Sequence, residues 1–182
     1  MATRVAHPRL TAETFDALVA RNGDRFDAEL IRGEVVVTPP DDPVGSSTVL
    51  ELLGRIFVWQ RARDDGSLLL PDVFVKLPPD TTVGPDLAWW SASRRPPIVR
   101  GPIRVVPDWV AEVLSPSTRE NDLGPKREDY LAAGVRELWL VDPADRSITL
   151  VDADGREQRA GSRCTSTVLD GFSVETDALF LD

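Results

Sequence analysis

The stretch from Trp109 to Asp142 constrains the fold of this chain more than any other. Its first part, Trp109 to Leu114, is apolar on both alternating sides except at Glu112, a pattern typical of a central strand covered on both faces. A helix is then predicted from Asp122 or Pro125 to Ala133, and a second apolar strand from Glu137 to Val141. Strand, helix and strand within about 33 residues predict a right-handed crossover between two parallel strands.

The other hydrophobic patterns predict a mixture of helices and short strands. The further predicted elements are, in chain order, a helix over Thr11 to Ala20, a hairpin over Phe26 to Thr38, an amphipathic helix over Ser46 to Arg63, strands over Leu68 to Leu77 and Asp86 to Trp90, a loop over Ser91 to Pro107, a hairpin beginning with Ile148 to Val151, a strand over Thr165 to Leu169 and a helix near Asp177 to Leu181. The predicted fold class is α/β (α+β, mixed sheet), with a mixed central β-sheet flanked by helices, an N-terminal hairpin and a C-terminal β-hairpin. Since no repeat or long linker divides the 182 residues, we expect a single domain over residues 1–182.

Composition excludes several classes of protein. No apolar run approaches the roughly 20 residues that cross a bilayer, and no secretory signal is visible, so a cytoplasmic protein without a membrane partner is expected. The single cysteine, Cys164, and the single histidine, His7, exclude an intramolecular disulfide and a His- or Cys-rich metal centre. The chemistry available to the chain therefore uses carboxylates, lysine, arginine or hydroxyls.

The charge balance limits how the chain could bind a polyanion. With 21 basic and 30 acidic side chains the net charge is -9, so nucleic acid would need a local basic groove or a divalent cation at the site. The densest basic patch comprises Arg94, Arg95, Arg100 and Arg104. This patch is either a solvated loop or a contact to the phosphate backbone.

Two carboxylates stand in otherwise apolar strands. If the strand that begins at Asp86 pairs antiparallel with the strand that contains Glu112, the two acids become neighbours. Burying an unpaired carboxylate costs several kcal/mol, so a compensating cation such as Mg²⁺ is expected. Two alternatives remain open: Glu112 forms a structural ion pair with Arg104 or Arg136, or Asp86 caps a turn.

Lys126 is the third candidate, since the chain has only two lysines. It is predicted to lie in the first turn of the crossover helix, where a cation opposes the helix dipole, so a demand other than helix stability would place it there. Asp122, four residues earlier, would cap the helix or approach the same cleft. The alternative is an ordinary solvated lysine.

Several stretches together resemble the Uma2 family, formerly a domain of unknown function. That family belongs to the PD-(D/E)XK nuclease superfamily of restriction-endonuclease-like folds. The resemblance runs from about Glu13 to the C-terminus and rests on Phe26 to Val37, Pro85-Asp86-Leu87, Pro107 to Ser117, Asp122 with Lys126, and Gly134 to Pro143.

The resemblance implies roles for particular residues. Asp86 and Glu112 take the two acidic positions of the superfamily, and Glu29 matches an additional acid from the first hairpin, although a cross-strand pair of Glu29 with Arg32 is an alternative. The lysine expected two residues after the glutamate is absent, because Leu114 stands there. Lys126 fits a lysine that has moved to the following helix. The histidine that many members carry after the hairpin is also missing here.

These roles predict a metal-dependent endonuclease that hydrolyses DNA phosphodiester bonds. The alternatives are a catalytically inactive nuclease-fold protein that serves as a nucleic-acid or protein interaction module, and a structural protein. The predicted catalytic residues are Asp86, Glu112 and Lys126; the predicted ligands of Mg²⁺ or Mn²⁺ are Asp86, Glu112, the Val113 carbonyl and Glu29; Asp122 is a supporting residue; and Arg94, Arg95, Arg119 and Arg127 are possible nucleic-acid contacts. A homo-oligomer, most simply a homodimer, is expected because nucleases that cut both strands often pair.

Overall fold

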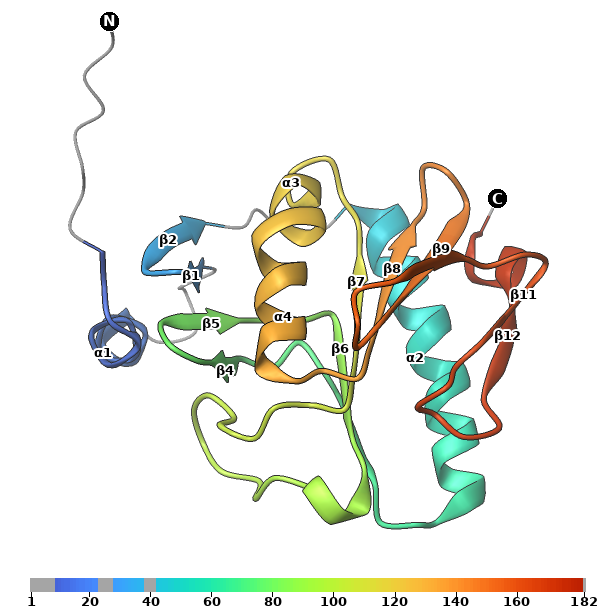
Figure 1. Cartoon of the computed structure of the whole chain (residues 1–182), viewed down its shortest axis with the longest axis horizontal. Coiled ribbons are helices and arrows are strands. Elements are labelled where there is room, and N and C mark those ends of the chain that lie inside the picture. Colours follow the sequence, from blue (N-terminus) through green and yellow to red (C-terminus); the bar gives the residue numbers. More distant parts are fainter. Residues whose placement is uncertain (1–8, 23–27, 38–41, 182) are drawn as a thin grey trace, which may run out of the picture.

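The computed structural model describes residues 9–22, 28–37 and 42–181, and a six-stranded mixed sheet forms its centre (Figure 1). The neighbouring strands β7 and β8 run parallel, while every other pair in this sheet is antiparallel. The predicted crossover between parallel strands is therefore confirmed. In order across the sheet, the strands are β10 (Glu157–Arg159), β9 (Ser147–Asp152), β8 (Glu137–Asp142), β7 (Trp109–Val113), β6 (Leu87–Trp90) and β3 (Leu68–Pro71).

Two smaller sheets and the helices complete the described part of the chain. The four-stranded sheet has the order β2 (Glu34–Val37), β1 (Ala28–Ile31), β5 (Thr81–Val83) and β4 (Val75–Leu77), and the C-terminal hairpin consists of β11 (Arg163–Thr165) and β12 (Ser173–Glu175). The helical elements are α1 (Ala12–Asn22), α2 (Pro43–Arg63), η2 (Ala92–Arg94), α3 (Arg119–Asn121), η3 (Asp122–Lys126), α4 (Arg127–Ala133) and η4 (Thr176–Leu179). None of the described helices is long and apolar enough to cross a membrane.

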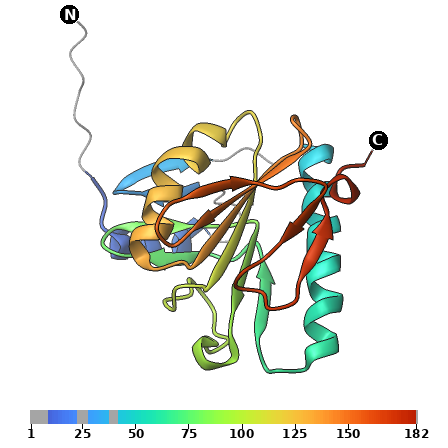
Figure 2. The same cartoon turned by 45° about the vertical axis from the view of Figure 1, so that its right-hand side comes forward.

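The central sheet is covered on both faces, as the apolar pattern of β7 predicts. Figures 1 and 2 show α2 with the hairpin β11–β12 on one side and α4 with the four-stranded sheet on the other. Trp109 and Ala111 of β7 pack in the cluster that contains Leu52 of α2, whereas Val110 packs in the cluster that contains Tyr130 of α4. Successive strand residues point to opposite faces. The side chain after Ala111, that of Glu112, therefore points toward α4.

Helix α2 begins three residues earlier than predicted, at Pro43 instead of Ser46. The Asp42 carboxylate accepts a hydrogen bond of 2.8 Å from the backbone N–H of Gly45 and caps the helix. Proline in the first turn loses no hydrogen bond, because the first N–H groups of a helix have no intrahelical acceptor. The sequence thus contained the correct start signal, an Asp followed by a Pro.

The predicted strand over Leu68 to Leu77 is wrong, because the chain forms two strands, β3 and β4, in different sheets. Asp72 adopts a left-handed conformation with φ 45° and ends β3. Strand β5 lies between two predicted strands, in a segment where no strand was predicted, and β12 was not predicted either. The last predicted strand, Thr165 to Leu169, overlaps β11 only at its first residue. Three-residue strands contain too few residues for a periodic pattern. Phe26 and Thr38 of the first predicted hairpin lie outside the described residues.

The crossover helix differs from its prediction in a way that affects the candidate site. It begins at Arg119, and the wide π turn η3 separates α3 from α4. Pro125 lies inside this turn, next to Gly124 with non-helical angles of φ -109° and ψ -106°. Proline lacks an N–H and disrupts a regular α-helix, which a local wide turn accommodates. Lys126 therefore lies inside the helical segment, and the argument from an unfavourable helix N-terminus is wrong.

Candidate functional site

Three acidic side chains surround the ammonium group of Lys126. Its Nζ lies 3.1 Å from Glu29 Oε1, 2.9 Å from Glu112 Oε1 and 3.0 Å from Asp122 Oδ1. Lys126 and Glu112 are each 3% exposed. The structure thus brings together residues from β1, β7 and η3, which are far apart along the chain. We call Glu29, Asp86, Glu112, Asp122, Lys126 and Tyr130 the Lys126 cluster.

Asp86 joins the cluster through the pairing of β6 with β7. Leu87 pairs with Ala111 in this antiparallel ladder, so one step further along the ladder places Asp86 beside Glu112. The Asp86 carboxylate accepts a hydrogen bond of 2.6 Å from the backbone N–H of Val113. Asp86 is only partly buried, so this side of the cluster reaches solvent. The contact at Val113 uses its N–H, and the role of its carbonyl as a metal ligand stays a prediction.

The alternative partners considered for Glu112 contact other residues. Arg104 lies 4.0 Å from Asp16, and Arg136 lies 3.8 Å from Asp108. The buried acid of β7 is instead paired with Lys126. A carboxylate and an ammonium that are both buried stabilise each other only at close range and with further hydrogen bonds, and this pair has both.

Glu29 is fixed by the four-stranded sheet and does not pair with Arg32. The backbone N–H of Gly84 donates to Glu29 Oε1 at 2.8 Å. Arg32 instead reaches α4, where it lies 2.7 Å from both Glu128 and Asp129. This bridge ties the four-stranded sheet to the helical segment that carries Lys126, which favours the approach of Glu29 to the ammonium group.

Tyr130 belongs to the site but was not identified from the sequence. Its hydroxyl donates a hydrogen bond of 2.6 Å to Glu112 Oε1, and the side chain is fully buried. Asp122, Lys126 and Tyr130 follow one another at intervals of four residues, a spacing that places side chains on one face of a helix. This spacing was the signal that could have revealed the tyrosine.

Burial and charge shift the proton affinities of the cluster. Burial raises the pKa of Glu112 well above its usual value, Lys126 partly opposes this, and the negative charges of Asp122, Asp86 and Glu29 raise it further. For Lys126 burial acts to lower the pKa, but Glu112, Glu29 and Asp122 outweigh it and the pKa is raised well above its usual value. Burial and then the Glu112 charge raise the pKa of Tyr130. Lys126 is therefore a stable cation, and Tyr130 remains a neutral donor.

The donor set fits a divalent cation in its chemistry. Three carboxylates contact a single ammonium group, and a fourth, that of Asp86, lies beside Glu112, so the fully ionised cluster would carry an excess of negative charge. Mg²⁺ favours oxygen donors and needs only one or two carboxylates besides water and substrate oxygens, as Asp86 and Glu112 offer. Among the described residues, Asp122 Oδ1 is buried without a well-formed hydrogen bond, although the Lys126 ammonium lies nearby.

The described residues contain no ready-made group of three acidic, histidine or cysteine side chains in metal-binding geometry. The Lys126 ammonium lies where the side chains of Glu29, Glu112 and Asp122 converge. Asp86, which directly precedes β6 and is only partly buried, and the neighbouring Glu112 are therefore the donors that best fit a metal ion.

All four arginines predicted to contact nucleic acid bind their own chain. The side chains of Arg119 and Arg127 remain 45% and 22% exposed, on either side of η3. Their role toward nucleic acid stays a prediction. The partners are Asp108 for Arg94 (3.0 Å), the Gly66 carbonyl for Arg95 (3.1 Å), Asp142 for Arg119 (2.6 Å), and Glu157 for Arg127 (2.8 Å).

Comparisons with known proteins agree with this architecture. A family model described as "Uma2: Putative restriction endonuclease" matches residues 12–174. Among solved structures, a similar chain is described as "a putative nuclease belonging to DUF820 from Anabaena variabilis"; it is 19% identical, with a TM-score of 0.73 over 84% of this chain and 89% of that chain. At this identity the likeness shows the fold, and it confirms the predicted fold class. No curated protein matches the chain.

Proposed function

The chain belongs to the Uma2 family, and from this premise we propose that it is a metal-dependent endonuclease that hydrolyses phosphodiester bonds in DNA. The observation that carries the proposal is the meeting of Asp86, Glu112 and Lys126 at a site that is open to solvent on the Asp86 side. A buried cluster with excess negative charge is costly for a protein to maintain. A role in binding a cation beside a phosphate gives a reason for that cost.

Asp86 and Glu112 are the proposed metal ligands, with the Val113 carbonyl and Glu29 as further donors. A bound Mg²⁺ or Mn²⁺ ion would polarise the phosphate and lower the pKa of a bound water molecule. Tyr130 supports this arrangement by holding Glu112 Oε1 in a fixed position through its hydroxyl.

Lys126 acts in this proposal as a fixed positive charge. Its raised pKa keeps the ammonium protonated at neutral pH, so it would stabilise the charge that develops on the phosphate and would not remove a proton from water. Asp122 supports the lysine from 3.0 Å. A lysine at such a site could stabilise charge or act as a general base. The raised pKa favours charge stabilisation, because a general base must be deprotonated to act.

DNA binding would depend on local charge, because the chain as a whole carries -9. Arg119 and Arg127 flank the η3 turn that contains Lys126, and both are partly exposed. Contacts of this kind position the phosphate backbone and weaken as salt rises. Affinity for DNA should therefore be modest and strongly dependent on ionic strength.

A plasmid-nicking assay with Mn²⁺ or Mg²⁺ tests the proposal. The test variants are Asp86→Asn and Glu112→Gln, which keep the size of each side chain, and the control is Glu120→Gln, which changes an exposed acid of α3. Loss of a metal ligand removes several kcal/mol of charge stabilisation, so we expect nicking to fall at least about 100-fold in both test variants. The control should match the unaltered protein.

Binding of Mn²⁺, followed by electron paramagnetic resonance, separates the possible outcomes. We expect the unaltered protein and Glu120→Gln to bind the ion and the two test variants to bind it weakly. Equal nicking by all four proteins would identify a contaminating nuclease. Absence of both nicking and Mn²⁺ binding in the unaltered protein would refute the proposal and favour a nuclease-fold protein with an interaction role.

A further inference from the structure

The outward face of α2 carries an unusual number of exposed apolar side chains. Val44 is 57% exposed, Leu50 67%, Phe57 53% and Val58 69%. Figure 2 shows α2 along the outer edge of the molecule, with only its inner side against the sheet. Exposed apolar side chains that gather on one surface are typical of a protein interface when the patch they form is large.

Gly54 lies at the centre of this face. Leu50 and Val58 are four residues before and after it, so all three residues follow one stripe along the helix. A Cβ atom at Gly54 would meet no atom within 4 Å, so packing within the chain does not require glycine here. Glycine inside a helix costs about 1 kcal/mol relative to alanine. A glycine at this position instead allows another helix to approach closely.

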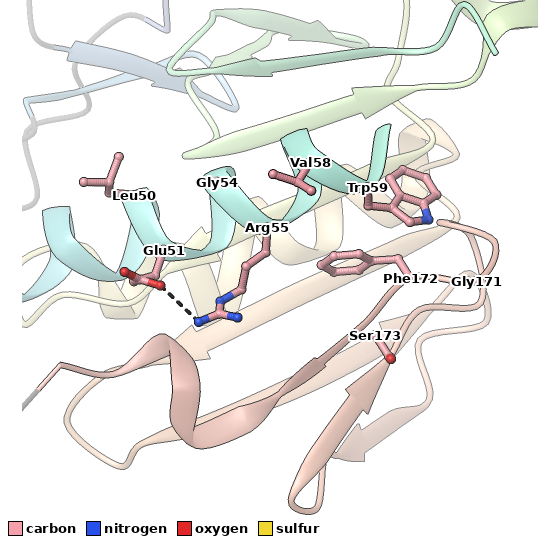
Figure 3. A pocket seen from close by; sticks show the side chains of 9 residues that line it. All are labelled: Leu50, Glu51, Gly54, Arg55, Val58, Trp59, Gly171, Phe172 and Ser173. Atoms are coloured by element: carbon pink, nitrogen blue, oxygen red, sulfur yellow. Dashed lines mark hydrogen bonds and ion pairs between the residues drawn. The ribbon is translucent and has the colours of Figure 1, made fainter. Parts of the chain in front are cut away.

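A groove of about 660 Å³ runs beside this stripe, between α2 and the hairpin β11–β12. The residues that line this groove include Leu50, Gly54 and Val58 of α2 and Phe172 next to β12, all labelled in Figure 3. The figure also shows Glu51 and Arg55 on the hairpin side of the helix, where they form an ion pair of 3.2 Å. The flank of the apolar stripe thus carries one acid and one base, in that order along the chain.

We propose that this face binds the same face of a second copy of the chain, with the two α2 helices antiparallel about a two-fold axis near Gly54. A two-fold axis places the same flank of both helices together but reverses their direction. Glu51 of each copy then faces Arg55 of the other, while Leu50 of each lies near Val58 of the other. The face is therefore complementary in charge and in apolar surface to itself, which favours a second copy over an unrelated partner.

Charge-reversal variants test this arrangement directly. Glu51→Arg gives a flank with two bases, and Arg55→Glu gives a flank with two acids. Each variant alone should be monomeric in sedimentation or light-scattering measurements at a concentration where the unaltered protein is dimeric. An equimolar mixture of the two should form dimers again, because opposite flanks meet. A change confined to the ion pair within one chain could not produce this recovery.

Two further proteins complete the experiment. Gly54→Phe should raise the dimer dissociation constant at least about tenfold, since a ring there blocks helix approach while its own chain leaves space for it. Glu34→Arg, a charge reversal on exposed β2, should leave the dimer intact. The proposal is overturned if the unaltered protein is monomeric at about 100 μM, if the two charge variants do not recover on mixing, or if Gly54→Phe dimerises as tightly as the unaltered protein.

Discussion

Replacement of Lys126 by methionine should destabilise the protein strongly. Methionine fills much of the same space but leaves Glu29, Glu112 and Asp122 without the cation that lies within 3.1 Å of each. Breaking a buried ion pair costs about 3–5 kcal/mol, a large part of the roughly 5–15 kcal/mol that holds a typical domain folded. For a chain of this size the corresponding fall in Tm is about 6–20 °C.

The loss should depend on pH, and its sign follows from Glu112. The pKa of Glu112 in the folded protein is raised well above its usual value of 4.5, mainly by burial, and Lys126 acts against that rise. Without the lysine the folded variant binds this proton more tightly than the unfolded chain does. Stability of the variant should therefore fall as pH rises above about 4.5. Its deficit relative to the unaltered protein is expected to be larger at pH 8 than at pH 5.

Urea unfolding followed by tryptophan fluorescence measures this deficit, because Trp90, Trp109 and Trp139 are fully buried. The matched control is Lys76→Met, which changes the only other lysine of the chain. Lys76 is also buried, at 9% exposed, but it pairs with a single carboxylate, that of Asp16, which is 28% exposed and also lies 4.0 Å from Arg104. Its loss should therefore cost less than the loss of Lys126, about 1–3 kcal/mol. The reasoning is refuted if Lys126→Met is no less stable than Lys76→Met at pH 8, or if its deficit is the same at pH 5.

Three smaller perturbations follow from other buried groups. Tyr130→Phe removes the hydroxyl that donates to Glu112 and should lower the unfolding free energy by about 1–3 kcal/mol in urea unfolding. An unchanged urea midpoint would show that this hydrogen bond does not stabilise the fold. Glu137→Leu removes the acceptor for the Ser166 hydroxyl and for the Thr167 backbone N–H and hydroxyl, so amide hydrogen exchange should accelerate first in β11 and β12. Uniform acceleration across the central sheet would show that Glu137 does not specifically hold this hairpin. Cys164 is 1% exposed, and burial raises the pKa of its thiol to about 12. A disulfide reagent should therefore label it only as fast as the protein opens. Rapid labelling at pH 8 under native conditions would show that the thiol is accessible in the folded protein.

The extent to which the fold could be predicted depended on the length of each pattern. The five residues of β7, the six of β8 and the 21 of α2 carry enough apolar positions to define a period, and all three elements were predicted. Strands β5 and β12 have three residues each, and their partners lie elsewhere in the chain. Their extended conformation is decided by pairing with another strand, which a local pattern does not contain.

The residues of the candidate site also fall into those that the sequence identified and those that only the structure revealed. Single acids in apolar strands identified Asp86 and Glu112, the scarcity of lysine identified Lys126, and the resemblance to the Uma2 family added Glu29. Composition alone determined that carboxylates and a scarce lysine would supply the chemistry, because the sequence offers one histidine and one cysteine. Only the tertiary structure decided that Lys126 contacts three carboxylates and that Tyr130 holds Glu112, since these contacts join β1, β7 and the π turn across gaps in sequence. Electrostatic energy depends on distances between atoms in space and on their burial, and both quantities exist only once the chain has folded.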